Sequence, residues 1–308
     1  MKYSGHESFS IRKNWLQKGI RKIDAFTKND FETMDELGLG RNMVKSLRYW
    51  LKATGLSEDE PKKKHLQLSP LGKIIMENDP YIQETGTLCL LQYNLASNKE
   101  NATSWYYLFN EFNMTEFSEE DFCRSLQKWD EMNNTKKAAI SSFQKDFDCI
   151  RRTYISRSEN YEDPESNMDS PFAELGLLNI TEKNELKKMT PLKSNIPAII
   201  LFSLILKMHG NEILKQSVCR PACRLAEQVE VHNNSSFELK LSSLLNDKCS
   251  PGKIFNMDSI LLMNLLSELE NKNFLEVVRT AGLDVVRIKN NITFEECVNQ
   301  YYKELKNE

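Results

Sequence analysis

An imidazole and a carboxylate stand side by side near the start of the chain, at His6 and Glu7 in the stretch "GHESFSIRKNWLQKG". Such a pair could form part of a nuclease site, position a phosphate, or hold a metal with a third ligand. The structural alternative is that His6 is an interface or capping residue and that Glu7 favours the N-terminus of a helix predicted from Phe9 to Ile20. Neighbouring residues of a non-helical stretch point in different directions, so the two side chains need not share one site.

A metal-dependent site needs more carboxylates than this pair supplies. Mg²⁺ and Mn²⁺, the ions we consider, prefer oxygen ligands, and two further carboxylates are not found nearby in the sequence. The first candidate from the rest of the chain is Asp284, in "RTAGLD". The catalytic hypothesis therefore names His6, Glu7 and Asp284, leaves the metal unknown, and favours His6 as a contact to DNA over a complete metal centre.

A basic surface is predicted on a helix from Arg41 to Thr54. Its apolar residues Val44, Leu47 and Leu51 recur at helical spacing and should face a core. The cations of the helix step by four, three and four residues, so they share one face: Arg41, Lys45, Arg48 and Lys52. Asn42 lies at the N-terminal end of this face, where a major-groove helix meets base edges.

The elements around this helix follow the order of a winged helix-turn-helix. A short helix from Phe31 to Leu37, with Asp30 as its N-cap, precedes the turn "GLG", in which Gly38 and Gly40 supply positive φ. After the basic helix, a polar tip leads into a short strand, and "LSPLG" restarts a helix. The tip adds further candidate nucleic-acid contacts: Lys62, Lys63, Lys64 and His65. The alternative is a solvated face on a domain that binds protein.

Charge is divided unevenly along the 308 residues. Residues 1–75 hold 15 Lys+Arg against 9 Asp+Glu, a net charge of +6, and the remaining residues hold 26 against 35, a net charge of -9. The basic N-terminal quarter favours contact with an anion, whereas the acidic remainder suits docking to other proteins.

The sequence predicts a mainly α-helical protein. Residues 1–80 form the winged helix-turn-helix, and residues 81–155 form a helical bundle segment packed on it. Residues 156–171 have few apolar side chains and two prolines, which is typical of a linker. Residues 172–308 form a mainly helical C-terminal domain, in which a helix from Asp258 to about Glu270 is followed by two β-rich runs, Phe274–Thr280 and Leu283–Ile288. This terminal β-hairpin predicts a second winged-helix-like unit.

The remaining motifs mainly exclude functions. The 7 cysteines are scattered, which favours a reduced cytoplasm. Cys219 and Cys223 in "CRPAC", with His209 and His232 at a distance, have poor spacing for zinc and favour buried or idle thiols. The most apolar run, "IPAIILFSLILKM", is shorter than the ~20 residues of a membrane span. The N-terminus shows no apolar signal segment, and P-loop, dinucleotide and metalloprotease motifs are missing. We therefore expect a cytoplasmic protein that does not engage a membrane.

Several motifs, in order, resemble a bacterial family first catalogued as a domain of unknown function: "GHESFSIRKNWLQKG", "ELGLGRNMVKSLRYWLKATGL", "LSPLG", "TSWYYLFNEF" and "RTAGLD". Members of this family lie beside sulfotransfer genes in phage-defence islands, and its best-known branch is the SspB component of the Ssp DNA phosphorothioation system. The resemblance runs over nearly the whole chain and is densest in residues 4–56. It places the family's Gly-His-Glu run on Gly5, His6 and Glu7 and its helix on Arg41 to Thr54.

The resemblance implies a DNA-binding component of a phosphorothioation or related phage-defence system, with nicking of duplex DNA as the activity to test. The partners it implies are duplex DNA, a cysteine desulfurase, an ATP-pyrophosphatase-like sulfur transferase and an ATPase. Two alternatives stay open: a non-catalytic winged-helix adaptor that docks the sulfur-transfer enzymes onto each other, and a transcriptional regulator of the same operon. The basic helix favours DNA binding, whereas the acidic second half favours the adaptor.

Overall fold

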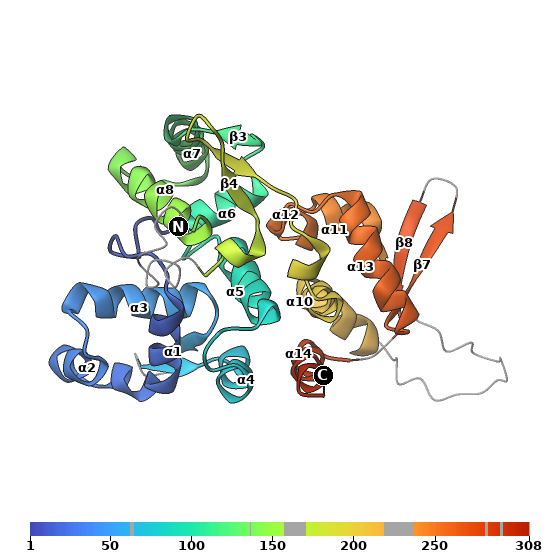
Figure 1. Cartoon of the computed structure of the whole chain (residues 1–308), viewed down its shortest axis with the longest axis horizontal. Coiled ribbons are helices and arrows are strands. Elements are labelled where there is room, and N and C mark those ends of the chain that lie inside the picture. The colour runs from blue at the N-terminus through green and yellow to red at the C-terminus, as the bar shows by residue number, and fades with distance from the viewer. Residues whose placement is uncertain are drawn as a thin grey trace.

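The structure is a computed structural model of the chain and describes residues 1–61, 65–135, 137–156, 171–218, 237–280, 283–289 and 292–307. Most of its elements are helices, and its strands form small antiparallel sheets (Figure 1). The expected mainly α class is therefore confirmed. The N-terminal helices gather at one end of the molecule and the C-terminal helices at the other, with helix α5, at Thr85–Ser97, between them.

The N-terminal unit combines helices with a two-stranded ribbon. Its elements in chain order are α1 Lys13–Arg21, the 3-10 helix η1 Ile23–Thr27, α2 Asp30–Leu37, α3 Arg41–Ala53, β1 Ser57–Asp59, β2 Leu66–Leu68 and α4 Pro70–Asn78. The ribbon is antiparallel, with Ser57 opposite Leu68 and Asp59 opposite Leu66. The order that the sequence predicts, from the first helix through the glycine turn to the ribbon, is present.

An amide cap and one glycine set the boundaries of α2 and α3. Asn29, and not the expected Asp30, caps α2, because its side-chain oxygen accepts two backbone N–H groups of the first turn. Gly38 ends α2 in the left-handed region at φ 60°, whereas Gly40 has φ -66°. The prediction of positive φ is correct for Gly38 and wrong for Gly40, because only the residue directly after the last turn of α2 reverses the chain.

Helix α1 begins later than its apolar pattern predicts. Residues 9–12 precede it in non-helical backbone, and the side chain of its N-cap residue, Arg12, makes no capping hydrogen bond. Trp15, Leu16 and Ile20 are nevertheless buried, so the pattern identifies the inward face and misses only the start. Glu7 lies five residues ahead of Arg12, the N-cap of α1, which removes the interpretation that its charge favours this helix N-terminus.

Helices α5 to α8 form the centre of the molecule. After α5 come α6 Thr103–Asn110, β3 Glu116–Phe117, α7 Glu119–Asn133 and α8 Ile140–Tyr154. Every residue of α6 is buried, as its aromatic-rich sequence requires. Helix α7 opens with a capping box in which the side chains of Ser118 and Asp121 each accept the other's backbone N–H. A serine followed by acidic residues is a usual sequence signal of a helix start, and here it coincides with the first turn of α7.

A three-stranded sheet crosses the domain boundary that the sequence predicts. Following the short 3-10 helix η2 Ala173–Leu175, strands β4 Leu178–Ile180 and β5 Leu186–Lys188 pair with each other, and β5 also pairs with β3. The sequence assigns this segment to the mainly helical C-terminal domain and predicts no strands there, but both strands form a sheet with β3 of residues 81–155, because a two-residue strand such as β3 needs partners. The predicted linker, residues 156–171, lies almost wholly outside the described residues.

Lys188 ties this sheet to the end of α6. Its ammonium group donates to the backbone carbonyls of Leu108, at 2.7 Å, and Phe112, at 2.5 Å. Carbonyls in the last turn of a helix lack partners within the helix, so the ammonium group caps them. Burial, and secondarily the charge of Lys253, lower the pKa of Lys188 to about 7.

The C-terminal part packs helices on a second three-stranded sheet. Its elements are η3 Lys193–Asn195, α10 Ala198–Val218, β6 Phe237–Lys240, α11 Leu241–Asn246, α12 Pro251–Ile254, α13 Ser259–Asn271, β7 Leu275–Thr280, β8 Leu283–Ile288 and α14 Phe294–Leu305. The sheet order is β6-β8-β7, so the predicted helix and hairpin are present and β6 is an additional strand. Helix α10 contains most of the apolar run, and no described helix, α10 included, is both long and apolar enough to cross a membrane.

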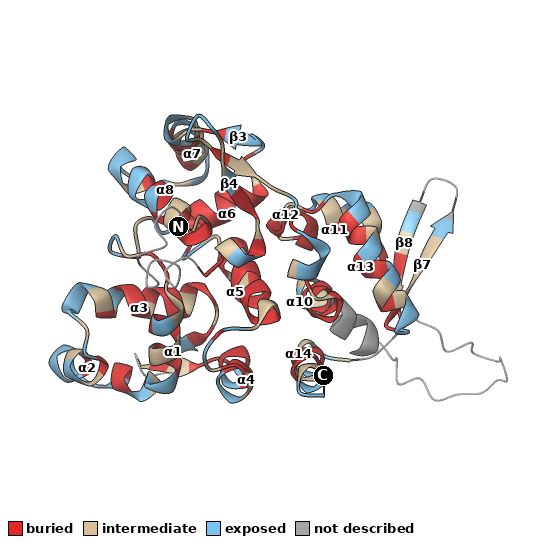
Figure 2. Ribbon diagram, in the orientation of Figure 1, coloured by how far each residue is buried: buried red, intermediate tan, exposed pale blue. Residues whose placement is uncertain are grey.

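One continuous hydrophobic core runs through the described residues of both halves (Figure 2). Helix α5 packs against α6 on one side and against α10 and α12 on the other. Its first turn is also bonded to α14: the Tyr301 hydroxyl accepts the Gly86 N–H at 3.0 Å, and the hydroxyls of Thr87 and Tyr302 lie 2.6 Å apart. The two halves therefore share their core instead of meeting at a thin interface.

The lowered pKa of Lys188 predicts a pH dependence of stability. The folded-state pKa of about 7 lies below the ordinary 10.5, so the unfolded chain binds more protons between these pH values. The free energy of unfolding should rise with pH across this window, by up to roughly 1.4 kcal/mol per pH unit, and this contribution is lost as the pH falls to 7. Urea unfolding at pH 7, 8 and 9 should show a smaller rise for Lys188→Met than for the wild type. Lys187→Met is the control, because Lys187 is partly exposed and pairs with Glu116; equal pH slopes for all three proteins would contradict the prediction.

Candidate nucleic-acid interface

The outer face of α3 carries the polar residues that the sequence places there. Arg41, Asn42 and Lys45 are exposed, and Arg48 and Lys52 are partly exposed. The opposite side of the helix is buried and includes Val44, Leu47, Tyr49, Trp50 and Leu51. Tyr49 and Trp50, which interrupt the basic run in the sequence, are therefore core residues and not stacking platforms for bases.

Two cations of this face are paired with carboxylates from neighbouring elements. Arg41 lies 3.4 Å from the Asp30 carboxylate at the start of α2. Lys52 lies 2.6 Å from the Asp59 carboxylate on β1. Ion pairs between exposed groups contribute little to stability, and a phosphate oxygen can replace a carboxylate oxygen as the partner of either cation. These pairs hold the cations in place without removing them from use.

Arg48 and Lys45 differ in how firmly they are held. The guanidinium of Arg48 lies 5.2 Å from the ring centroid of Phe26, which is buried in η1. This cation–π contact fixes the side chain against the N-terminal unit while its edge stays accessible. Lys45 is exposed one turn earlier on the same face. An anchored guanidinium and an exposed ammonium are both suited to phosphate contacts.

The described residues of the ribbon beside α3 are mainly acidic. Lys62, Lys63 and Lys64 lie outside the described residues. His65 is partly exposed, and its Nδ1 atom lies 4.0 Å from the Glu60 carboxylate across the ribbon. Strand β1 brings Glu58 and Asp59 to the same ribbon. Among the described residues of the ribbon, His65 could therefore contact an anion, whereas the three carboxylates would repel it.

His6 is completely buried, with 0% of its surface exposed. Its Nε2 atom lies 2.8 Å from Oδ1 of Asp146 on α8, and its ring stacks on Trp50 at a centroid distance of 6.0 Å. A carboxylate accepts hydrogen bonds, so Nε2 carries the hydrogen and donates it. The expected direct contact between His6 and DNA is not available in this conformation, because the ring lies between α3 and α8.

Glu7, the neighbour of His6, points outward. It is exposed and has φ 50°, and the next residue, Ser8, has φ 72°. Residues other than glycine seldom adopt the left-handed region, and where they do so the surrounding structure holds them there. The two halves of the His-Glu pair thus face in opposite directions, one into the core and one into solvent.

Asp284 does not join His6 and Glu7. It lies on β8 opposite Arg279 of β7, and in Figure 1 this hairpin is at the opposite end of the molecule from the N-terminus. Across the described parts of the chain, no group of three or more His, Cys, Asp or Glu side chains is arranged to hold a metal ion. The three residues of the catalytic hypothesis therefore do not form one site, and they do not fit a Mg²⁺ or Mn²⁺ centre.

Comparison with known proteins supplies a family and a fold. A family model described as "Protein of unknown function (DUF4007)" matches residues 3–302. The chain belongs to the DUF4007 family. The resemblance indicated by the sequence motifs, to a family catalogued as a domain of unknown function with an SspB branch, is thereby confirmed.

Two solved structures resemble this DUF4007 chain closely in fold. An SspB crystal structure is 22% identical in sequence with a TM-score of 0.76, and the match covers 99% of this chain and 87% of that one. A magnesium ion-bound SspB crystal structure is 21% identical with a TM-score of 0.76, covering 99% of this chain and 94% of that one. A search among curated proteins found no match.

Sequence reasoning missed the polar residues that surround His6. Asp146 is buried on α8 and accepts hydrogen bonds from His6, from the Ser4 N–H and from the Ser104 hydroxyl of α6. Nearby, the Tyr3 hydroxyl donates to Asp130 of α7 at 2.6 Å. Burial and this hydrogen bond raise the pKa of Tyr3, so the phenol keeps its proton at neutral pH. Helical spacing places both aspartates on the apolar faces of their helices, Asp146 three residues after Phe143 and Asp130 four residues after Leu126, and this signal could have marked them as buried. Their partners could not be found in this way, because each contact joins distant parts of the chain.

The zinc hypothesis is untested by the described part of this DUF4007 chain. Cys219, Cys223 and His232 lie outside the described residues. His209, the fourth residue of that hypothesis, lies on α10 with its ring 5.7 Å from that of Phe237. The cysteines that the structure does describe are free thiols.

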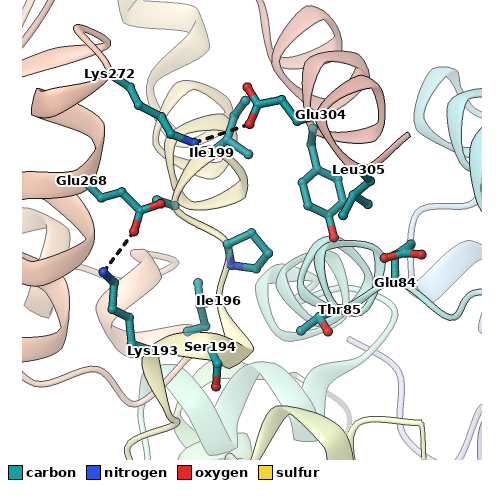
Figure 3. A pocket seen from close by; sticks show the side chains of 13 residues that line it. Glu84, Thr85, Lys193, Ser194, Ile196, Ile199, Glu268, Lys272, Glu304 and Leu305 are labelled. Carbon is teal, nitrogen blue, oxygen red and sulfur yellow. Dashed lines mark hydrogen bonds and ion pairs between the residues drawn. The ribbon is translucent and has the colours of Figure 1, made fainter. Parts of the chain in front are cut away.

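An open pocket of about 570 Å³ lies away from α3, between the first turns of α5 and α10 and the last turns of α13 and α14 (Figure 3). Two ion pairs cross its rim: Lys193 with Glu268 at 3.0 Å, and Lys272 with Glu304 at 3.4 Å. Its cations are therefore already matched by carboxylates of the same DUF4007 fold, and Glu84 adds a further negative charge to the lining. The pocket has neither the charge nor the place of a surface for nucleic acid.

The left-handed backbone of Glu7 predicts that glycine is better tolerated there than in most of the chain. Glu7→Gly should raise the free energy of unfolding by up to about 1 kcal/mol, because glycine has no Cβ to clash at positive φ. Glu7→Gln should leave stability unchanged, because the side chain is exposed. Urea unfolding measures both effects. Ser8→Gly is a second test, because it should relieve the same backbone strain at positive φ. A loss of stability in Glu7→Gly would show that the carboxylate makes structural contacts.

Proposed function

We propose that this protein is the DNA-binding component of a bacterial DNA phosphorothioation system or a related phage-defence system. The observation that carries the proposal is the outer face of α3, where four cations and Asn42 share one side of a helix that follows a tight turn. The motifs shared with the family and the likeness in fold to SspB support the choice of system.

The arrangement we propose is a winged helix-turn-helix. Helix α2, the turn at Gly38 and helix α3 would form the helix-turn-helix, and β1 with β2 would form the wing. In that arrangement Arg41 and Asn42, at the N-terminal end of α3, meet base edges, since arginine pairs with guanine and asparagine with adenine in the major groove. Lys45, Arg48 and Lys52 then contact phosphates, which fix the register of the protein on the duplex.

The proposed protein partners follow from the same resemblance. They are a cysteine desulfurase, an ATP-pyrophosphatase-like sulfur transferase and an ATPase of the same gene cluster. The net charge of -9 on residues 76–308 supports docking of proteins on this part of the chain, because DNA is repelled from it. DNA and protein partners would thus use different ends of one molecule.

Nicking of duplex DNA is the activity that the resemblance adds to DNA binding. The residues first considered for it are separated in space, so we place DNA binding first and derive no metal-assisted step. The alternatives are a non-catalytic adaptor, which would bind the sulfur-transfer proteins and leave DNA intact, and an operon regulator, which would bind one operator sequence far more tightly than random DNA.

DNA affinity should fall with salt, and the slope should depend on α3. Each phosphate contact removed should flatten the plot of log affinity against log salt concentration by roughly one unit. Lys45→Ala and Arg48→Ala should each show this change with a short duplex, measured by fluorescence anisotropy between low and physiological salt. Lys128→Ala is the matched control, since it removes an exposed lysine from a helix, α7, outside the proposed face. Affinity unchanged in both α3 variants would refute the proposed interface.

A nicking assay with supercoiled plasmid distinguishes between the two hypotheses, a nicking protein and a non-catalytic adaptor. Incubation of purified protein with plasmid, with Mg²⁺ or Mn²⁺ and without either ion, should convert supercoiled DNA to the open circle if the protein nicks. Because Glu7 and Asp284 lie apart, Glu7→Gln and Asp284→Asn should not both abolish this activity. Binding without conversion under all conditions would favour the adaptor or the regulator, and loss of nicking in both variants would restore the composite site.

A further inference from the structure

The first eleven residues form a strap that crosses four helices of the N-terminal half. The Lys2 N–H donates to Thr103 of α6 at 2.9 Å, and Tyr3 donates to Asp130 of α7 at 2.6 Å. Further along, the Phe9 carbonyl accepts the indole N–H of Trp50 on α3 at 3.1 Å. We call residues 1–11 the N-terminal strap. Its contacts reach α3, α6, α7 and α8, so it lies where these helices meet.

His6 holds the centre of the strap. Its Nε2–H and the Ser4 N–H both donate to Oδ1 of Asp146 on α8, each at 2.8 Å, and the Ser104 hydroxyl of α6 donates to Oδ2 at 2.6 Å. One buried carboxylate therefore joins the strap to two helices, and both of its oxygens accept hydrogen bonds. The other ring nitrogen of His6, Nδ1, has no hydrogen-bond partner among the described residues. An imidazole with one committed nitrogen and no exposed surface is placed for bonding within the protein.

The ring of His6 also fixes the inner side of α3. It stacks on Trp50 with an angle of 20° between the ring planes and meets Tyr49 edge-on at 6.2 Å. Gly5 brings the strap so close that a Cβ there would lie 2.6 Å from the Tyr49 ring. The strap thus contacts the side of α3 that is opposite to its cations.

Backbone strain collects in the same few residues. Ser4, Glu7 and Ser8 all have positive φ, at 53°, 50° and 72°. Such conformations persist only where surrounding contacts determine them, and the contacts of His6 lie between these three residues in the chain. Loss of the His6–Asp146 bond should therefore let the strap relax away from α3.

We propose that His6 is a positioning residue: through Asp146 and Trp50 it locks the N-terminal strap against α3 and sets the place of the DNA-binding face. The proposal rests on the proposed function, because it assigns the cations of α3 to DNA. It explains why the conspicuous His-Glu motif has its imidazole inside the protein: the ring acts on DNA only through α3.

Amide hydrogen exchange of the protein without DNA tests whether His6 holds the N-terminal strap against α3. His6→Leu keeps apolar bulk but removes the donor to Asp146, and His6→Gln keeps an N–H donor that can reach it. In His6→Leu, amides of residues 2–11 and 42–53 should exchange at least tenfold faster, and duplex affinity should fall by a similar factor. His6→Gln should recover most of both. Tyr302→Phe is the matched control, because it removes a buried hydrogen bond to Thr87 away from α3 and should change neither quantity.

The outcomes distinguish the proposal that His6 holds the strap against α3 from the proposal that α3 binds DNA. Unchanged exchange in His6→Leu would overturn the lock, whatever the protein does with DNA. Faster exchange with unchanged duplex affinity would overturn the positioning role. Loss of affinity in His6→Gln and His6→Leu alike, without faster exchange, would instead make His6 a direct contact. If His6→Leu fails to fold, Tyr3→Phe loosens the strap at Asp130 alone and carries the same comparison. The proposed function fails separately, if Lys45→Ala and Arg48→Ala bind duplex DNA like the wild type.

Discussion

A buried carboxylate must find a donor for each oxygen, and Asp146 places this constraint on the whole N-terminal half. Its donors come from the strap, at Ser4 and His6, and from α6, at Ser104. The start of the chain, α6 and α8 therefore have to meet at one point. The same meeting brings the His6 ring against Trp50, so the inner side of α3 is placed by a contact that begins at the Asp146 carboxylate. The cations of α3 face outward because everything apolar on that helix is used on the other side.

The shared core links this end of the molecule to the other. Helix α5 packs against α6 and also against α10 and α12, and its first turn is hydrogen-bonded to α14 through Tyr301 and Tyr302. A shift of α6 relative to α8 would therefore be felt in the C-terminal helices. In the proposed function, DNA on α3 and proteins on the acidic part of the chain would act on one packed body. Such a body can pass on a change of position more readily than two domains on a linker.

In this protein, features that depend on residues close in the chain are predicted from the sequence, and contacts between residues far apart in the chain are not. The buried side of α3 and the helix followed by β7 and β8 depend on residues close in the chain, and both are predicted. The pairing of β3 with β5 and the bond from His6 to Asp146 join residues far apart, and both are missed. The helical pattern does place Asp146 on the apolar face of α8, three residues after Phe143, and leaves the exposed Asp148 off it, but it does not identify the partners of the buried carboxylate. The His-Glu motif points to the right place in the chain, but only the fold shows that its two side chains face opposite ways.

Electrostatics on the proposed DNA face are more balanced than a count of lysines and arginines suggests. Arg41 and Lys52 already pair with Asp30 and Asp59, so a base edge at Arg41 and a phosphate at Lys52 would each have to displace a carboxylate. The displaced carboxylate must then be neutralised by a cation from solution, which offsets part of the counterion release that drives binding to DNA. General attraction to any duplex is weakened by this exchange, whereas a hydrogen bond from the uncharged Asn42 to a base edge is not. Discrimination between sequences would then depend on the exposed first turn of α3, where Asn42 carries no charge and its carboxamide can be read only by a base that matches it.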